Sequence, residues 1–109
     1  MKEFVLVFIG GEPENPEDLP KHYTEYGKFM SYLNNGNHFK SGIPVESSVG
    51  RMVENDAVIK SGDFMSISNK IGGIMVIKAD DIDHAADLAR HNPIIRNGGR
   101  ILVWPVKNI

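Results

Sequence analysis

The sequence of 109 residues contains no cysteine. Without thiols the chain can build neither a disulfide scaffold nor a zinc site with thiolate ligands, and it has no thiol nucleophile. A chain without cysteine is typical of a reducing compartment, so we expect a cytoplasmic protein.

Long hydrophobic runs and an excess of charge are also missing. No segment approaches the roughly 20 consecutive apolar residues that a membrane-spanning helix needs. The short apolar run at residues 4–9 has no small-residue cleavage site after it, so it predicts a strand and not a signal peptide. The net charge of −2 gives no electrostatic footprint for nucleic acid or an anionic membrane. We therefore expect neither partner.

Length and composition predict one globular domain over residues 1–109. Hydrophobic residues make up 41% of the chain and charged residues 24%, which is close to the averages of soluble domains. A chain of this size buries roughly two-thirds of its unfolded surface, which is enough for one core but not for two.

The hydrophobic period changes along the chain between that of a strand and that of a helix. Pro105 cannot donate a ladder hydrogen bond, so the last strand is expected either to lie at a sheet edge or to end at Pro105. The residues between the first helix and the hairpin read as turns, with Asn35-Gly36 ending the helix through a left-handed residue. The expected helices cover residues 21–35 and 81–92, the expected strands cover 3–9, 74–77 and 101–106, and a β-hairpin covers 51–59.

This order of elements favours an α+β fold, a ferredoxin-like antiparallel sheet with two helices on one face. The strands at residues 4–9, 74–77 and 101–106 are apolar on both faces, but two helices can cover only one of them. At about 25 cal/mol per Å², several hundred Å² of apolar surface left in water would cost about as much as the stability of the whole domain. We therefore predict an obligate homodimer that buries the second face.

Several segments, in order along the chain, resemble the YCII-related (DGPF-domain) family. Residues 61–73, which read SGDFMSISNKIGG, are similar to its Asp-Gly-Pro-Phe signature and the Gly-Gly that follows. The acidic helix start at 79–85 and the closing Pro and Gly elements at 92–106 are similar to later parts of the same family. The resemblance implies a dimeric α/β barrel, in which two ferredoxin-like sheets pack face to face. Most members have no assigned reaction, and others are similar to muconolactone-type isomerases and dehalogenases.

The chain departs from the family where a catalytic pair has been proposed, a His near the first helix and an Asp before the closing Pro. Asn92 takes the place of that Asp, and an amide can orient a ligand but cannot exchange a proton at neutral pH. Ser61 replaces the signature Asp, Trp104 stands where an Arg is usual, and His22 lies a few residues early. No catalytic residue is transferred, and the catalytic residues stay unknown.

Four polar side chains are the candidates for a ligand site between the first helix and the sheet: His22, Tyr26, Arg51 and Asp63. Arg51 would hold an anionic group, and His22 or Asp63 would move a proton. The polar segment 61–69 would line or cover the opening. These residues predict a cleft for a small anionic metabolite.

No metal and no cofactor is predicted. His84, Asp87 and His91 are spaced like metal ligands on one stripe of a helix. That stripe lies opposite the apolar Ala85 and Ala89, so we interpret it as the solvent face of an amphipathic helix.

Two classes of function stay open. The first is a dimeric small-molecule-binding or accessory module of unassigned activity, which agrees with the replacement of the family's Asp by Asn92. The alternative is an enzyme that acts on a small metabolite by acid/base chemistry, as lactone isomerases and dehalogenases do. The sequence does not decide whether the protein is an enzyme.

Overall fold

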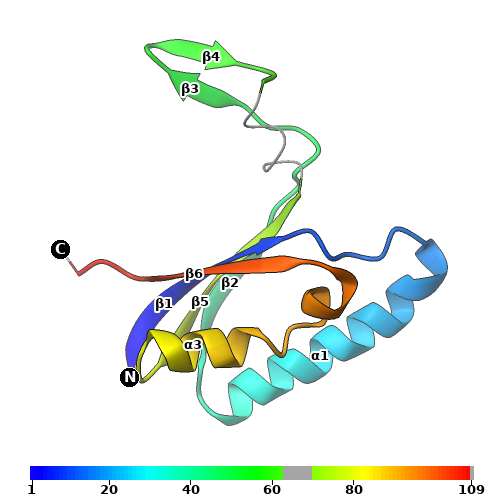
Figure 1. Cartoon of the computed structure of the whole chain (residues 1–109), viewed down its shortest axis with the longest axis vertical. Helices are drawn as coiled ribbons and strands as arrows, with labels where there is room; N and C mark the ends of the chain where they lie inside the picture. The colour runs from blue at the N-terminus through cyan, green and yellow to red at the C-terminus, as the bar shows by residue number, and fades with distance from the viewer. Residues whose placement is uncertain (63–69, 109) are drawn as a thin grey trace.

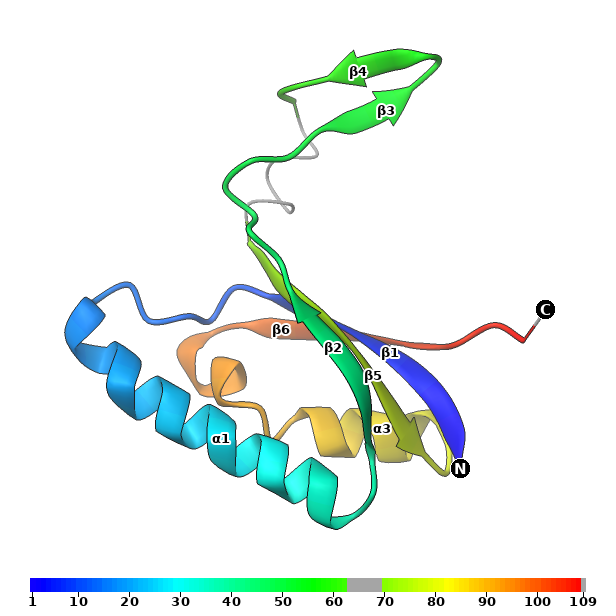
Figure 2. The same cartoon turned by 180° about the vertical axis from the view of Figure 1, so that it is seen from behind.

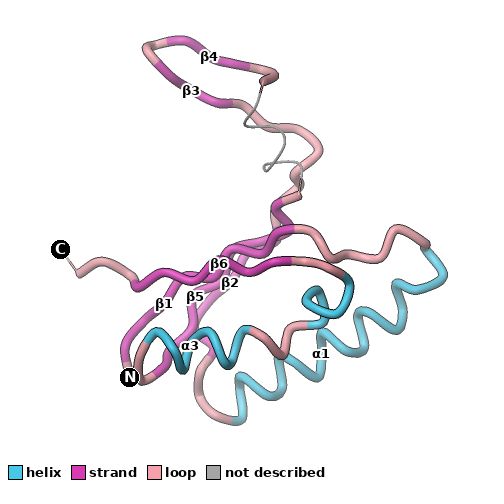
Figure 3. The backbone as a smooth tube through the Cα atoms, in the orientation of Figure 1, coloured by secondary structure: helices cyan, strands magenta, loops and turns pink. Residues whose placement is uncertain are grey.

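The computed structural model describes residues 1–62 and 70–108 and has an α+β architecture. Figure 3 shows the helices and strands along the backbone. The elements are β1 (Lys2–Ile9), η1 (Pro16–Asp18), α1 (Leu19–Asn35), β2 (Phe39–Pro44), β3 (Met52–Glu54), β4 (Ala57–Ile59), β5 (Ile71–Ala79), α3 (Ile82–Ala89), η2 (Pro93–Asn97) and β6 (Arg100–Pro105).

Four strands form an antiparallel sheet in the order β2-β5-β1-β6, and α1 and α3 both lie on one of its faces (Figure 1). This is the ferredoxin-like arrangement that the sequence predicts. β6 is an edge strand, in agreement with Pro105. None of the described helices is long and apolar enough to cross a membrane.

The core lies between the sheet and the two helices. Phe4, Leu6 and Phe8 of β1 are buried there, as their alternation predicted, and they pack with Phe29 and Leu33 of α1. β5 and α3 complete the layer with Met75, Ile77, Ala79, Ala85, Leu88 and Ala89.

The helix ends are fixed by local hydrogen bonds. At the start of α3 the Asp81 carboxylate accepts from the backbone N–H of His84 at 2.7 Å, the usual role of an N-cap side chain. The end of α1 differs from the prediction. Gly36 has φ −90°, and the left-handed residue is Asn37, with φ 59°. Asparagine tolerates this conformation almost as well as glycine does.

The structure corrects the expected place of the hairpin. β3 and β4 form as predicted and pair with each other, but they stand apart from the four-stranded sheet in both views (Figures 1 and 2). The sheet position beside β5 belongs to β2, a strand within the residues that we expected to be turns. We call residues 45–62, which carry this hairpin, the arm.

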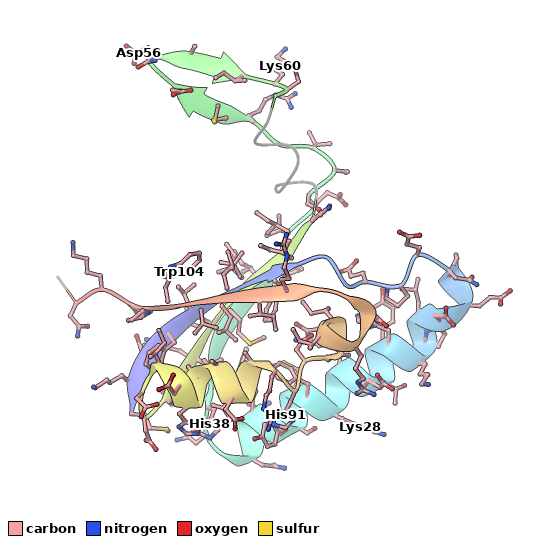
Figure 4. All side chains as sticks on the ribbon, in the orientation of Figure 1. Lys28, His38, Asp56, Lys60, His91 and Trp104 are labelled. Atoms are coloured by element: carbon pink, nitrogen blue, oxygen red, sulfur yellow. The ribbon has the colours of Figure 1, made fainter. Side chains whose placement is uncertain are left out.

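The second face of the sheet is apolar and open in the single chain. One cross-strand row runs over all four strands through Ile43, Ile74, Val7 and Leu102. Ile43 is 64% exposed and Leu102 is 40% exposed. Trp104 follows on β6, on the side away from the helices, and is 51% exposed (Figure 4). We call this surface the open face.

Candidate functional site

A cavity of about 440 Å³ lies between α1 and the neighbouring strands, and we call it the helix–sheet pocket. Its volume is in the range of small-molecule sites, and its walls are mainly apolar. The lining residues come from β1, α1, β2, β5, η2 and the loop after β1: Phe8, Gly10, Glu12, His22, Tyr23, Tyr26, Gly27, Met30, Phe39, Gly42, Ile43, Pro44, Gly72, Gly73, Ile74, Met75 and Ile94.

Gly27 belongs to the helix wall of the pocket, where it presents no side chain. Gly27 lies in the interior of α1, where glycine costs up to about 1 kcal/mol relative to alanine. A Cβ at this position would meet no atom within 4 Å, so packing does not require a glycine. The residue leaves the helix wall open at the pocket.

His22 is the buried polar residue of the helix wall. Its side chain lines the pocket and the residue is only 7% exposed. The ring lies beside Tyr26, with centroids 6.1 Å apart, and its Nδ1 has no hydrogen-bond partner among the described residues. A buried nitrogen without a partner costs free energy, and such atoms are found where a ligand, a water or a reacting group supplies the partner.

Asn92 is buried behind Tyr26, and its amide orientation is fixed. Its Oδ1 accepts from the backbone N–H of Ile94 at 3.0 Å, which caps η2. The Nδ2 group therefore points the other way, toward the Tyr26 phenol. Among the described residues the Nδ2 group has no hydrogen-bond partner that meets ordinary distance and angle limits. A donor at the phenol oxygen leaves the phenol proton free to point elsewhere.

The surroundings of Tyr26 shift its acidity. Burial raises the pKa of the Tyr26 phenol above its ordinary value of 10.0. The Asn92 amide acts in the opposite direction, and the Glu12 carboxylate adds to the increase in pKa. The phenol is thus protonated at neutral pH and serves as a hydrogen-bond donor or a weak acid.

We predict that replacing Tyr26 by phenylalanine changes how the free energy of unfolding depends on pH in the alkaline range. A folded-state pKa above that of the unfolded chain gives stability that is complete below about pH 10 and is lost as the pH rises through the folded value. The free energy of unfolding, measured with urea between pH 8 and 11, should fall less steeply for Tyr26→Phe than for the wild type. Parallel curves would contradict the prediction.

The charges around the pocket do not favour a strong anion. Glu12 is part of the lining, and no lysine or arginine is among the described residues that line the pocket. Lys70 and Arg100 line an adjoining depression of about 500 Å³, where they face the carboxylates of Glu12, Glu14 and Glu46. The carboxylates offset the two cations there.

The structure brings together two of the four residues that the sequence selected. His22 and Tyr26 both line the pocket. Arg51 does not, because it lies exposed on the arm, where its Nη1 donates to the Gly50 carbonyl at 2.7 Å. Asp63 lies outside the described residues. The expected cleft edged by Arg51 and Asp63 is therefore not part of the helix–sheet pocket that the structure describes.

Two residues of the pocket lining, Glu12 and Gly27, are not among the candidates that the sequence selects. For Asn92 the sequence predicts the role of orienting a ligand in place of the family's Asp. Gly27 could have been noticed in the sequence, because glycine destabilises the interior of a helix and is usually kept there for packing or function. The described residues contain no group of three or more His, Cys, Asp or Glu side chains that could hold a metal ion.

Comparison with known proteins finds a likeness in fold. No protein-family model and no curated protein matches the sequence of this chain. Among solved structures, 5-chloro-2-hydroxyhydroquinone dehydrochlorinase from Burkholderia phenoliruptrix AC1100, in complex with 2,5-dihydroxybenzoquinone, is similar with a TM-score of 0.52 and 16% sequence identity. The match covers 96% of this chain and 93% of the dehydrochlorinase chain. At this identity the likeness shows that the two chains share their fold over nearly their whole length.

Proposed function

We propose that this chain is a homodimeric small-molecule-binding protein of the YCII-related, dimeric α/β barrel type, with the helix–sheet pocket as its binding site. The observation that carries the proposal is the pocket itself. It has the volume of a ligand site, an apolar lining, and a buried His22 whose Nδ1 has no described partner. The similar fold of a small-molecule enzyme supports it.

The lining indicates the class of ligand. Aromatic and aliphatic side chains would surround an apolar body, while the Tyr26 hydroxyl offers a hydrogen bond to an acceptor oxygen. The Glu12 carboxylate and the lack of a described lysine or arginine in the lining favour a neutral compound over the anionic metabolite expected from Arg51. A neutral oxygenated single-ring compound fits these requirements. The dehydrochlorinase was solved with an oxygenated single-ring compound, 2,5-dihydroxybenzoquinone.

Matched pairs of ligands test this proposal. Single-ring phenols and quinones, each paired with the benzoate of the same substitution, would be screened by thermal shift and then by calorimetry, because a ligand that prefers the native state raises its stability. We expect neutral members to bind and benzoates to bind at least tenfold more weakly. Tighter binding of the benzoates would support the anionic ligand instead, and no binding of either kind would contradict the site.

We predict that Gly27→Leu closes the pocket. A leucine side chain at this position enters open space beside the pocket, so it should weaken ligand binding by at least tenfold without destabilising the fold. Gly27→Ala should raise the free energy of unfolding by about 0.5–1 kcal/mol, because alanine is the better helix former. Calorimetry and urea unfolding measure the two effects.

The matched control for Gly27→Leu is Lys28→Leu, the same side chain placed one residue further along α1. Lys28 is exposed and is not among the lining residues. The control should bind ligand as the wild type does. Equal binding by Gly27→Leu and the wild type would show that the ligand does not occupy the helix–sheet pocket.

The second candidate function is an enzyme, and one arrangement favours it. His22 and Tyr26 place two groups that can transfer protons beside one apolar cavity. Release of chloride from 5-chloro-2-hydroxyhydroquinone, lost in His22→Gln but kept in Lys28→Leu, would support this function. Binding without chloride release would support the binding module.

A further inference from the structure

The arm is the part of the structure that the pocket does not explain. β3 and β4 form a two-stranded sheet of three residues each, joined by Asn55 and Asp56, both of which have φ near +60°. Asn and Asp readily adopt this left-handed conformation, which is the turn geometry of a tight hairpin. A two-stranded hairpin is at best marginally stable alone in water. An arm of this kind therefore needs a surface to pack on.

The arm exposes apolar side chains that are paired across the strands. Val53 lies directly opposite Val58, and the two residues are 73% and 61% exposed. Val49 at the base of the arm is also exposed. These side chains are of the kind that a stable interface buries, and the described residues of the chain leave them exposed.

The direction of the arm indicates where such a surface would be. In both views the arm rises on the side of the sheet away from α1 and α3, the side on which Trp104 lies (Figures 1, 2 and 4). The chain is also less compact than a monomer of its length. Its radius of gyration is 15.2 Å, against about 13 Å expected for a chain of this length.

The open face has a smaller footprint than a standard subunit interface. Strands are spaced about 4.8 Å apart and rise about 3.4 Å per residue, so four strands with about six paired residues have a flat footprint of roughly 400 Å². A standard interface buries about 800 Å² on each partner. A second copy on the open face would lie beside the arm, whose exposed valines could add to the contact.

We propose that the arm packs its Val53–Val58 pair against a second copy of this chain that is docked on the open face. The two copies use the same surfaces in an isologous contact, so the arm of each subunit packs against the other subunit. This inference rests on the homodimer of the proposed function and adds to it a second interface element. Arg51, which the sequence suggested for ligand binding, then belongs to the subunit contact and not to the pocket.

The first test is the double variant Val53→Asp/Val58→Asp in the full chain. Both side chains are exposed, so the fold of the single chain should persist, while carboxylates would be forced into the arm contact. Sedimentation equilibrium should show a dimer dissociation constant at least tenfold larger than that of the wild type. Ile82→Asp is the control, because it replaces an exposed β-branched apolar residue by the same aspartate outside the arm and the open face, and it should dimerise normally.

The second test locates the arm directly. The chain has no cysteine, so Val53→Cys can carry a single photo-crosslinker. In a mixture of ¹⁵N-labelled and unlabelled protein we expect cross-links that join labelled to unlabelled chains. Two results would overturn the arm contact alone. One is a dimer whose cross-links stay within one chain, and the other is a dimer dissociation constant that Val53→Asp/Val58→Asp leaves unchanged. A monomeric wild type would overturn the arm contact and the homodimer together, and calorimetry on the pocket would still test the ligand site.

Discussion

Replacing Gly11 by alanine is expected to lower the free energy of unfolding by about 2–5 kcal/mol, whereas Gly10→Ala should lower it by only about 1–2 kcal/mol. Both glycines have positive φ, 68° at Gly10 and 79° at Gly11, which costs an alanine about 1–2 kcal/mol. They differ in what surrounds them. A Cβ on Gly10 meets no atom within 4 Å, but one on Gly11 would lie 2.5 Å from the Ile94 carbonyl oxygen and 2.9 Å from the Gly99 Cα.

The atoms that an alanine Cβ at residue 11 would contact cannot move aside easily. They belong to the backbone of η2 and of the turn before β6, where the Gly99 N–H donates to the Ile94 carbonyl at 2.8 Å. Overpacking of this kind costs a further 1–3 kcal/mol or so, because the two chain segments must separate. Urea unfolding of the two variants gives the comparison, and equal losses would contradict it.

This junction also holds one wall of the pocket. Ile94 contacts the ligand space, and it is placed there by η2, whose cap is Asn92. Gly11→Ala should therefore weaken ligand binding as well as stability, while Gly10→Ala should affect binding less. The Gly-Gly after the first strand thus connects the fold to the site, because it lets two loops approach more closely than side chains allow.

Periodicity predicted the elements that pack on the core, but it could not predict β2. β1 and β5 each contain a continuous apolar run, so the local sequence is enough to predict that they are strands. The sequence Phe-Lys-Ser-Gly-Ile-Pro at residues 39–44 has only two large apolar residues and contains both Gly and Pro. Its strand state comes from pairing with the free edge of β5, with a register shift between Phe39 and Ser41. Tertiary pairing of this kind leaves little trace in the segment itself.

The missed strand explains the misplaced arginine. The sequence selects Arg51 because it lies on a strand leading toward segment 61–69, opposite His22 at the start of the first helix. In the structure β2 takes the place beside β5, and the hairpin with Arg51 lies apart from the sheet. His22 and Tyr26 were found because their positions follow from the helical period of α1 alone. The site could therefore be predicted on its helix side and not on its sheet side.

The second prediction of large effect follows from the proposed homodimer: Leu102→Asp is expected to separate the subunits. Leu102 sits in the apolar row with Val7, Ile74 and Ile43, and in a symmetric dimer the substitution would place two carboxylates in the buried contact. At about 2 kcal/mol or more for each, the loss is about 4 kcal/mol, which corresponds to roughly a thousandfold weaker dimer. Leu102 is already 40% exposed in the single chain, so the fold itself should tolerate the change.

The single tryptophan makes this loss measurable. Trp104 lies on the open face, and burial in a dimer should shift its fluorescence to shorter wavelength than in a separated chain. Light scattering at micromolar concentration should report about twice the chain mass for the wild type and for Ile82→Asp, and the chain mass for Leu102→Asp, with its Trp104 emission shifted to longer wavelength. Val53→Asp/Val58→Asp should fall between them, because it removes the arm contact but keeps the open face. A Leu102→Asp protein that stays dimeric would show that the subunits meet elsewhere, and the open face would then need another partner.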